Sequence, residues 1–195
     1  MPFDPLTHVS LLLLTEQIGL AEYPGLSALA YTPPSQPSLR AAIAFRAQRS
    51  LLLRLLARRP WHARELCQLQ IGHTLFCEAG GWYLAASAAE SGLGWSAGLK
   101  SAGGGCAFPD ELVASLEEFL TVWRPMLLEE VCTPLFITRA GGPYTTSTLN
   151  REVVRIFRRY TRQSIGLPQI CQSWTSARRA VLQLGQLPHR LRRGN

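Results

Sequence analysis

The sequence predicts an α+β fold in which helices predominate and surround a small antiparallel sheet. Three long segments, 38–59, 110–123 and 148–162, are rich in helix formers or place apolar residues at helical spacing. Between the first two, the β-rich runs 71–78 and 82–86 are separated by a glycine-containing turn, which is a hairpin pattern. The Gly- and Ser-rich stretch 91–105 is either a loop or a poorly formed third strand.

Length and composition indicate one ordinary globular core. The chain has 195 residues, of which 47% are hydrophobic and 17% are charged, so a disordered or collagen-like chain is excluded. A domain of this size buries roughly 70% of the surface that its unfolded chain exposes, so it needs neither disulfides nor a metal to fold. We therefore predict one domain with an attached tail.

The cysteines and the apolar runs indicate a soluble, cytoplasmic protein. The five cysteines are widely spread and never form a Cys-x-x-Cys pair, so neither a disulfide framework nor a zinc module is expected. The apolar run Leu11–Leu14 is too short to cross a bilayer, and no basic residue precedes it as in a secretory signal. We expect no membrane partner.

Prolines and capping residues set the expected bounds of the first helices. Prolines divide the first 37 residues, so we expect one short helix at 9–18 and then a linker. Ser38 is a plausible N-cap of the next helix, which ends before Pro60 because the residue before a proline avoids the helical conformation. A short helical segment at 62–69 follows.

The second half of the chain completes the expected organisation. Residues 134–138 form a short strand or a buried extended piece, and a last helix is expected at 173–184. The expected parts of the chain are a linker or remnant of an N-terminal region over 1–37, a domain over 38–185, and a basic tail over 186–195.

Positive charge is concentrated in the last third of the chain. The formal net charge is +7, and nineteen of the twenty basic residues are arginine. From Arg139 onward eleven arginines accompany one acid, Glu152, whereas residues 1–138 hold nine basic and twelve acidic residues. A second basic stretch, 40–64, carries seven arginines and no acid. A fold that joins the two stretches would present a strongly positive surface, typical of a nucleic-acid partner and less often of an anionic membrane.

The segment 148–162 is strongly amphipathic. Its apolar residues recur at helical spacing and predict a core face; they are Leu149, Val153, Ile156, Phe157 and Tyr160. The opposite face is nearly pure arginine, and the last helix adds two more; we predict phosphate contacts for Arg151, Arg155, Arg158, Arg159, Arg162, Arg178 and Arg179. A solvated face usually mixes both signs, because like charges four residues apart repel. The alternative is a face that is only solvated.

The order of these elements resembles the catalytic domain of tyrosine recombinases, the phage-integrase type. The resemblance covers about residues 40–185 and lies in the helix ending RRPWHARELCQLQIG, the hairpin through GGWYL, the helix FPDELVASLEEFLTVWRPML, and PLFITRAGGPYTTSTLNREVVRIFRRYT. It implies a mostly helical domain with a small three-stranded antiparallel sheet that clamps double-stranded DNA. In that family a tyrosine forms a covalent link with the DNA phosphate, helped by two arginines, a hairpin lysine and histidines, without a metal or cofactor.

The family's catalytic positions are mostly changed in this chain. The resemblance places His62 where the first catalytic arginine stands, with Arg64 as a tentative substitute two residues away. Gly92 occupies the place of the hairpin lysine, and Lys100 would reach the site only if the Gly-rich loop folds back. Strand-cleaving activity is therefore uncertain and not expected from these positions.

The downstream part of the catalytic set is changed as well. The His-x-x-Arg box would fall at Gln169 and Gln172. The last tyrosine, Tyr160, lies far upstream of the nucleophile's place, and we expect Tyr144 to be a turn residue and Tyr160 a core residue. The resemblance thus indicates a truncated, DNA-binding domain associated with DNA integration and recombination.

Two alternatives stay open. A partner subunit of a homo-oligomer could supply a tyrosine in trans, which would keep an active enzyme. Otherwise the chain is a non-enzymatic interaction protein or gene remnant whose arginines only solvate the surface. None of these readings involves a small-molecule substrate.

Overall fold

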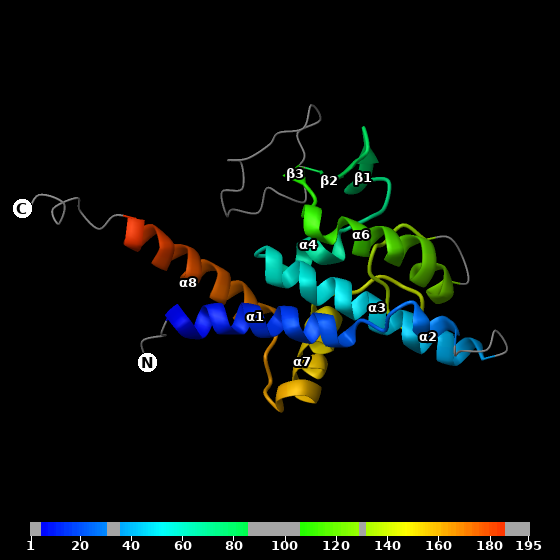
Figure 1. Cartoon of the computed structure of the whole chain (residues 1–195), viewed down its shortest axis with the longest axis horizontal. Coiled ribbons are helices and arrows are strands. Elements are labelled where there is room, and N and C mark those ends of the chain that lie inside the picture. Colours follow the sequence, from blue (N-terminus) through cyan, green and yellow to red (C-terminus); the bar gives the residue numbers. More distant parts are fainter. Residues whose placement is uncertain (1–4, 31–35, 86–105, 129–131, 186–195) are drawn as a thin grey trace, which may run out of the picture.

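A computed structural model gives the fold of residues 5–30, 36–85, 106–128 and 132–185; for 5–7, 29–30 and 178–185 it describes the backbone alone. Within these ranges the chain is mostly helical with one small sheet, as predicted (Figure 1). The elements are α1 (Pro5–Glu22), α2 (Ser27–Ala30), α3 (Pro37–Arg58), α4 (Ala63–Cys67), β1 (Leu75–Glu78), β2 (Gly81–Leu84), β3 (Cys106–Ala107), α6 (Asp110–Glu118), α7 (Thr146–Thr161) and α8 (Leu167–Gly185).

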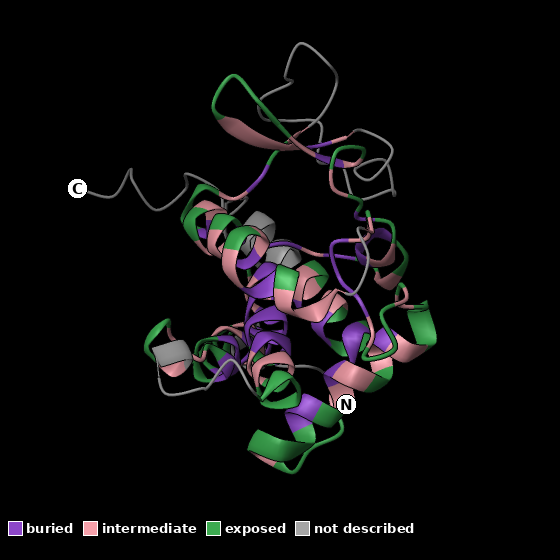
Figure 2. Cartoon of the chain, turned by 90° about the vertical axis from the view of Figure 1, so that its right-hand side faces the viewer, coloured by how far each residue is buried: buried purple, intermediate pink, exposed green. Residues whose placement is uncertain are grey.

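Helix α3 is the centre of the molecule, and α1, α6 and the turns after α6 pack around it (Figures 1 and 2). Its run Leu51–Leu56 is buried apart from Arg54, which is partly exposed. The helix ends at Arg58, and Arg59 is extended (φ −151°, ψ 145°), as expected before Pro60. The predicted N-cap Ser38 was wrong: the N-cap is Gln36, because Pro37 suits the first helical turn, where its missing N–H costs nothing.

The predicted hairpin is confirmed. Strands β1 and β2 are antiparallel with Leu75 opposite Leu84 and Glu78 opposite Gly81, so the loop has two residues, Ala79 and Gly80. Both have positive φ (48° and 82°), the conformation that matches the twist of a two-residue hairpin. The short strand β3 pairs with β2 and gives the order β1-β2-β3. The stretch 91–105 lies outside the described residues.

The predicted helix 110–123 changes its winding partway. After α6 the chain forms a π-helical turn over Phe119–Trp123 and a 3₁₀ turn over Arg124–Leu127. Pro125 has no N–H, so it cannot bond to the carbonyl of Thr121 as an α-helical turn requires. The Thr121 hydroxyl also bonds to the carbonyl oxygen of Glu117 at 2.7 Å, which favours a bend. The regular α-helix therefore ends five residues earlier than its apolar spacing predicts.

Helix α7 matches its predicted stripe with one correction. Leu149, Val153, Ile156 and Phe157 are buried, whereas Tyr160, predicted to be a core residue, is 40% exposed. Tyr160 lies in the last turn, beyond the core, and its hydroxyl reaches across to Glu22 at 2.9 Å. A tyrosine suits this partly solvent-exposed position, because its ring is apolar and its hydroxyl is polar.

Helix α8 begins earlier than its predicted start. It runs from Leu167 rather than residue 173. The backbone N–H of Leu167 donates to Oδ1 of Asn150 on α7 at 2.9 Å. A Cβ on Gly166 would lie 2.5 Å from that same oxygen, so the tight connection between the two helices requires glycine. This local contact was not visible in the apolar spacing.

Residues 5–22, within the segment expected to be a linker or remnant, form a packed helix. The predicted helix at 9–18 is present but longer, and α1 lies against α3 and α8. Ile18 is 3% exposed, and His8, at 3% exposure, has Nδ1 3.2 Å from the Ser173 hydroxyl oxygen. A Cβ on Gly19 would lie 2.8 Å from Cγ of Arg54, so glycine allows α1 to approach α3 closely. The division of the chain into domains stays a prediction.

Buried charges link α1, α3 and α7. Arg49 on α3 is 5% exposed; its Nε donates to Glu152 on α7 at 2.8 Å, and its Nη1 lies 3.4 Å from Glu22 at the end of α1. The Glu22 side chain is fully buried and also accepts from Arg159 and Tyr160. A buried ion is tolerated only when it is paired, so these contacts fix the three helices together.

Substituting Arg49 tests this link. Arg49→Met should lower the free energy of unfolding by about 3 kcal/mol, because buried Glu22 loses one of its two cationic partners. Urea unfolding followed by circular dichroism measures the change. The exposed Arg46 on the same helix is the control, and Arg46→Met should stay within about 0.5 kcal/mol of the wild type. Equal effects at the two positions would contradict the role of the buried network.

Candidate nucleic-acid interface

The arginine face of α7 is exposed as predicted. Thr145 caps the helix, accepting from the N–H of Thr148 at 3.2 Å, and Arg162 ends it in the left-handed conformation (φ 61°). With the apolar stripe buried, the outer face carries five exposed arginines: Arg151, Arg155, Arg158, Arg159 and Arg162. The side chains of Arg178 and Arg179 lie outside the described part of the structure.

Several of these arginines have partners that the helical pattern does not show. Arg155 donates to Glu152 at 2.6 Å, and Arg159 lies 3.5 Å from Glu22 of α1. Arg158 Nε donates to the Ser164 hydroxyl at 2.7 Å. For Arg151 and Arg162, no hydrogen bond or ion pair joins them to another described residue. The face is thus partly neutralised at Arg155 and Arg159 and fully cationic elsewhere.

The second basic stretch, 40–64, does not add its full charge to this surface. Its arginines were expected on the solvent-exposed side of α3, and this was wrong for two of them. Arg49 and Arg59 are buried. Arg54 and Arg58 both contact Glu16 of α1, at 3.4 and 3.2 Å. The acidic residues of α1 account for Arg49, Arg54 and Arg58. Arg59 instead lies over the Trp61 ring and contacts the Cys106 sulfur. Only part of the stretch therefore remains free to bind an anion.

One pocket nevertheless brings both basic stretches together. It has a volume of about 300 Å³ and lies between α3, the turn 138–144 and the first half of α7. Its walls carry four arginines, one acid, two threonines and two aromatic rings: Phe45, Arg49, Thr138, Arg139, Tyr144, Thr148, Arg151, Glu152 and Arg155. The formal charge of this set is +3, four arginines less one glutamate.

A buried amide places the turn that carries Arg139. Gln48 on α3 acts as a strand would: its Nε2 donates to the Ile137 carbonyl at 2.9 Å, and its Oε1 accepts from the Ile137 N–H at 3.0 Å. The expected piece 134–138 is buried at Leu135–Ile137 and makes isolated bridges at Pro134 and Ile137, but the chain bends at Leu135 and Phe136, so it is not a continuous strand. Arg139 follows directly, with its guanidinium 5.8 Å from the Phe45 ring centroid.

The turn after Arg139 places Tyr144 at the pocket. The Thr138 N–H and hydroxyl both donate to the Gly142 carbonyl, and Gly141 has φ +80°, which closes the turn. Tyr144 is half-buried there. Burial, and then the charge of Glu152, raise its pKa to about 12, although the three nearby arginines act in the opposite direction. Its hydroxyl therefore keeps its proton and can donate a hydrogen bond.

Arg139 and Tyr144 were not among the predicted site residues, and only a weak signal pointed to them. Arg139 begins the basic part of the chain, and the residues that follow it form a glycine-rich turn before a helix cap. Their position beside α7 depends on Gln48, more than eighty residues away, and helical periodicity carries no information about that contact.

The degenerate position His62 and its tentative substitute Arg64 do not line this pocket. His62 is exposed, precedes α4, and its backbone N–H donates to Oε2 of Glu65 at 2.7 Å, as in a capping box. Arg64 is exposed on α4, away from the pocket lining. Lys100 lies outside the described residues. Among the described residues, His62 and Arg64 therefore share no pocket with the α7 arginines.

The positions of the His-x-x-Arg box support the helix rather than chemistry. Gln169 Oε1 accepts from the backbone N–H of Gly166 at 3.0 Å, which satisfies a free donor before the start of α8. Gln172 is exposed one turn further on. Neither amide can replace an imidazole in proton transfer.

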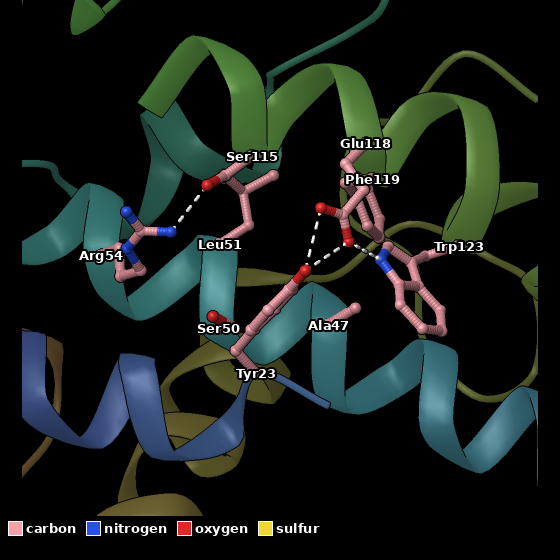
Figure 3. A pocket seen from close by; sticks show the side chains of 9 residues that line it. All are labelled: Tyr23, Ala47, Ser50, Leu51, Arg54, Ser115, Glu118, Phe119 and Trp123. Carbon is pink, nitrogen blue, oxygen red and sulfur yellow. Dashed lines mark hydrogen bonds between the residues drawn. The ribbon is translucent and has the colours of Figure 1, made fainter. Parts of the chain in front are cut away.

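A second, smaller cavity of about 10 Å³ is a structural junction (Figure 3). Glu118 there accepts hydrogen bonds from Tyr23 at 2.8 and 2.9 Å and from the Trp123 indole at 2.6 Å, while Arg54 donates to Ser115 at 2.7 Å. These bonds use most of the polar side chains that line the gap. The cavity joins the segment after α1 to α3 and α6 and has no room for a ligand.

Other kinds of site are not found in the described part of the chain. No group of three or more His, Cys, Asp or Glu side chains there could hold a metal ion. The five cysteines are all free thiols. None of the described helices combines the length and apolar character needed to span a membrane.

Comparisons with known proteins assign no family. The chain matches no protein-family model, no curated protein and no solved structure.

The pH dependence of stability tests the environment of Glu65. Burial raises its pKa above 4.5, against the opposing hydrogen bond from His62 and the charges of His62 and Arg59. A carboxyl whose pKa is raised by folding contributes its full stability below the unfolded pKa and loses it as the pH rises through the folded pKa. The stability of the wild type relative to Glu65→Gln should therefore fall as the pH rises above 4.5.

Urea unfolding of both proteins across this pH range gives the difference directly. The exposed Glu78, replaced by glutamine, is measured alongside as the matched control for removal of one surface charge. A Glu65→Gln difference that is flat would contradict the raised pKa.

Proposed function

We propose that this protein binds double-stranded DNA through its phosphates, using the exposed arginines of α7 together with Arg139. The observation that carries the proposal is the convergence of Arg139, Arg151 and Arg155, from two separate segments, on one pocket mouth. Guanidinium groups match phosphate oxygens in charge and geometry. Phosphate contacts give affinity without reading bases, so little sequence preference is expected.

We further propose that the chain is a tyrosine-recombinase-like protein associated with DNA integration and recombination. A mostly helical body beside a small antiparallel sheet supports this, as does the order of its elements. This part of the proposal rests on the sequence resemblance, since no family model, curated protein or solved structure matches.

The proposal does not include strand cleavage. The hydroxyl of Tyr160 donates to buried Glu22, and burial followed by this hydrogen bond raises its pKa. The pKa of Tyr144 is raised to about 12. A tyrosine nucleophile needs its proton removed, and the raised pKa of each of these two phenols opposes that loss. Three of the family's other catalytic positions are held here by His62, Gln169 and Gln172. None of these residues lines the pocket, so they supply no catalytic arginine or histidine there.

A salt titration tests DNA binding. Fluorescence anisotropy of a labelled duplex oligonucleotide should show affinity falling steeply between about 50 and 200 mM salt. A variant with Arg151, Arg158 and Arg162 changed to Gln should reduce the slope of log affinity against log salt by about 2 to 3, because three phosphate contacts are lost.

The control is Arg58→Gln, an exposed arginine of α3 that already contacts Glu16 and Glu111. Its salt slope should stay close to that of the wild type. Absence of binding at low salt, or binding indifferent to salt, would leave the arginines as a merely solvated face and would contradict the proposal.

A suicide DNA substrate tests the absence of cleavage. Such a substrate traps any tyrosine–phosphate link, because the cleaved fragment diffuses away and the reversal is lost. We expect no slow-migrating adduct on a denaturing gel, alone or at protein concentrations that favour oligomers. A covalent band that disappears in Tyr160→Phe or Tyr144→Phe would show that the chain is an enzyme.

A further inference from the structure

The pocket beside α7 holds donors that the fold does not use. Arg151 has no hydrogen bond or ion pair with any described residue, and the same is true of the Tyr144 hydroxyl. The Arg139 guanidinium contacts the Phe45 ring but no carboxylate among the described residues. Arg155 uses one nitrogen on Glu152 and keeps its other N–H groups. These groups surround one volume of about 300 Å³.

The remaining donors favour one ligand chemistry. Three guanidinium groups and one neutral phenol hydroxyl suit a ligand that carries a negative charge and several oxygen acceptors. The one acid of the lining does not oppose such a ligand, because Glu152 already accepts from Arg49 and Arg155. The Phe45 and Tyr144 rings provide an apolar wall on which the organic part of an ester can lie.

We propose that this pocket binds a single phosphate group, with Arg139, Arg151 and Arg155 contacting its oxygens and Tyr144 donating a further hydrogen bond. This inference rests on the proposed function in one respect, that the phosphate belongs to a DNA strand. The chemistry is shared by a strand phosphodiester and by free phosphate, and the experiment separates the two.

Part of the pocket is organised before a ligand binds: Arg155 and the turn that carries Arg139 are held by other residues, whereas Arg151 has no partner among the described residues. Arg49 lines the pocket but is buried and already paired; it holds Glu152 at 2.8 Å, and Glu152 in turn holds Arg155 at 2.6 Å. Gln48 fixes the turn that carries Arg139. Groups that are held in place lose less conformational freedom on binding than mobile surface arginines do. One phosphate should thus be bound more tightly than those along the rest of α7.

Duplex binding by matched variants tests the pocket against the general surface. Arg139→Gln and Arg151→Gln should each weaken duplex binding about tenfold, as expected for a lost charge-assisted contact. Tyr144→Phe, which changes no charge, should weaken it about fivefold. The control is Arg162→Gln on the same helix but outside the pocket lining, with an expected loss of about threefold or less. Circular dichroism and thermal unfolding check that each variant folds.

Inorganic phosphate is the second probe. It is titrated at constant ionic strength against sodium chloride and followed by NMR shifts of labelled arginine side chains. If the pocket variants weaken duplex binding more than Arg162→Gln does and phosphate causes no shift, the occupant is a strand phosphodiester. If phosphate alone shifts the signals of Arg139 and Arg151, and Tyr144→Phe weakens phosphate binding, free phosphate also binds. Either result supports the pocket.

The failures of the two proposals differ. If the wild type binds the duplex but the pocket variants and Arg162→Gln lose equal affinity, the proposal of a phosphate site is overturned. The proposal of DNA binding then still stands. If the wild type binds no duplex but phosphate shifts the pocket arginines, the site stands and the DNA proposal fails. If neither probe binds, both are overturned.

Discussion

The fold depends on a buried arginine. Arg49 lies buried in the middle of α3, and its charge can be kept there only with carboxylates close to it. One carboxylate, Glu22, comes from the end of α1, and the other, Glu152, comes from α7. Separating either helix from α3 would leave a charge buried without its partner. The three helices are therefore held in one arrangement by electrostatics as well as by apolar packing.

This network also decides which charges face outward. Three carboxylates, those of Glu16, Glu22 and Glu152, are largely buried and paired with arginines. Little unpaired acidic charge is therefore left near the outer half of α7. Arg139, Arg151 and Arg162 remain without carboxylate partners among the described residues. An arginine face that looked uniform in sequence is thus divided into positions that stabilise the fold and positions free for a ligand.

Sequence periodicity predicted the elements whose burial is one-sided. The stripe Leu149, Val153, Ile156 and Phe157 predicted α7, and the two apolar runs about Gly80 predicted the hairpin, because alternation and helical spacing are local properties. Helix α1 was predicted only in part, since its apolar residues lie on all sides and prolines on either side suggested a linker.

The site was less predictable than the fold. The exposed arginines of α7 followed from the pattern, but the choice of Glu22 as a partner for Arg159 depends on the docking of α1. Likewise, the pocket requires Arg139 and Tyr144 to lie beside Arg151, and it is Gln48 on α3 that brings their turn there. Such contacts join positions far apart in the chain, and no spacing rule within a single segment can reveal them.

Binding and cleavage place opposite demands on a tyrosine near a phosphate. Cleavage needs the phenol to lose its proton as it attacks, whereas binding needs the phenol to keep the proton and donate it in a hydrogen bond. At Tyr144, burial and the charge of Glu152 outweigh three arginines and raise the pKa to about 12. The residue is therefore suited to hold an oxyanion and poorly suited to attack one. The same carboxylate that positions Arg155 thus adds to the effect of burial in keeping the phenol neutral.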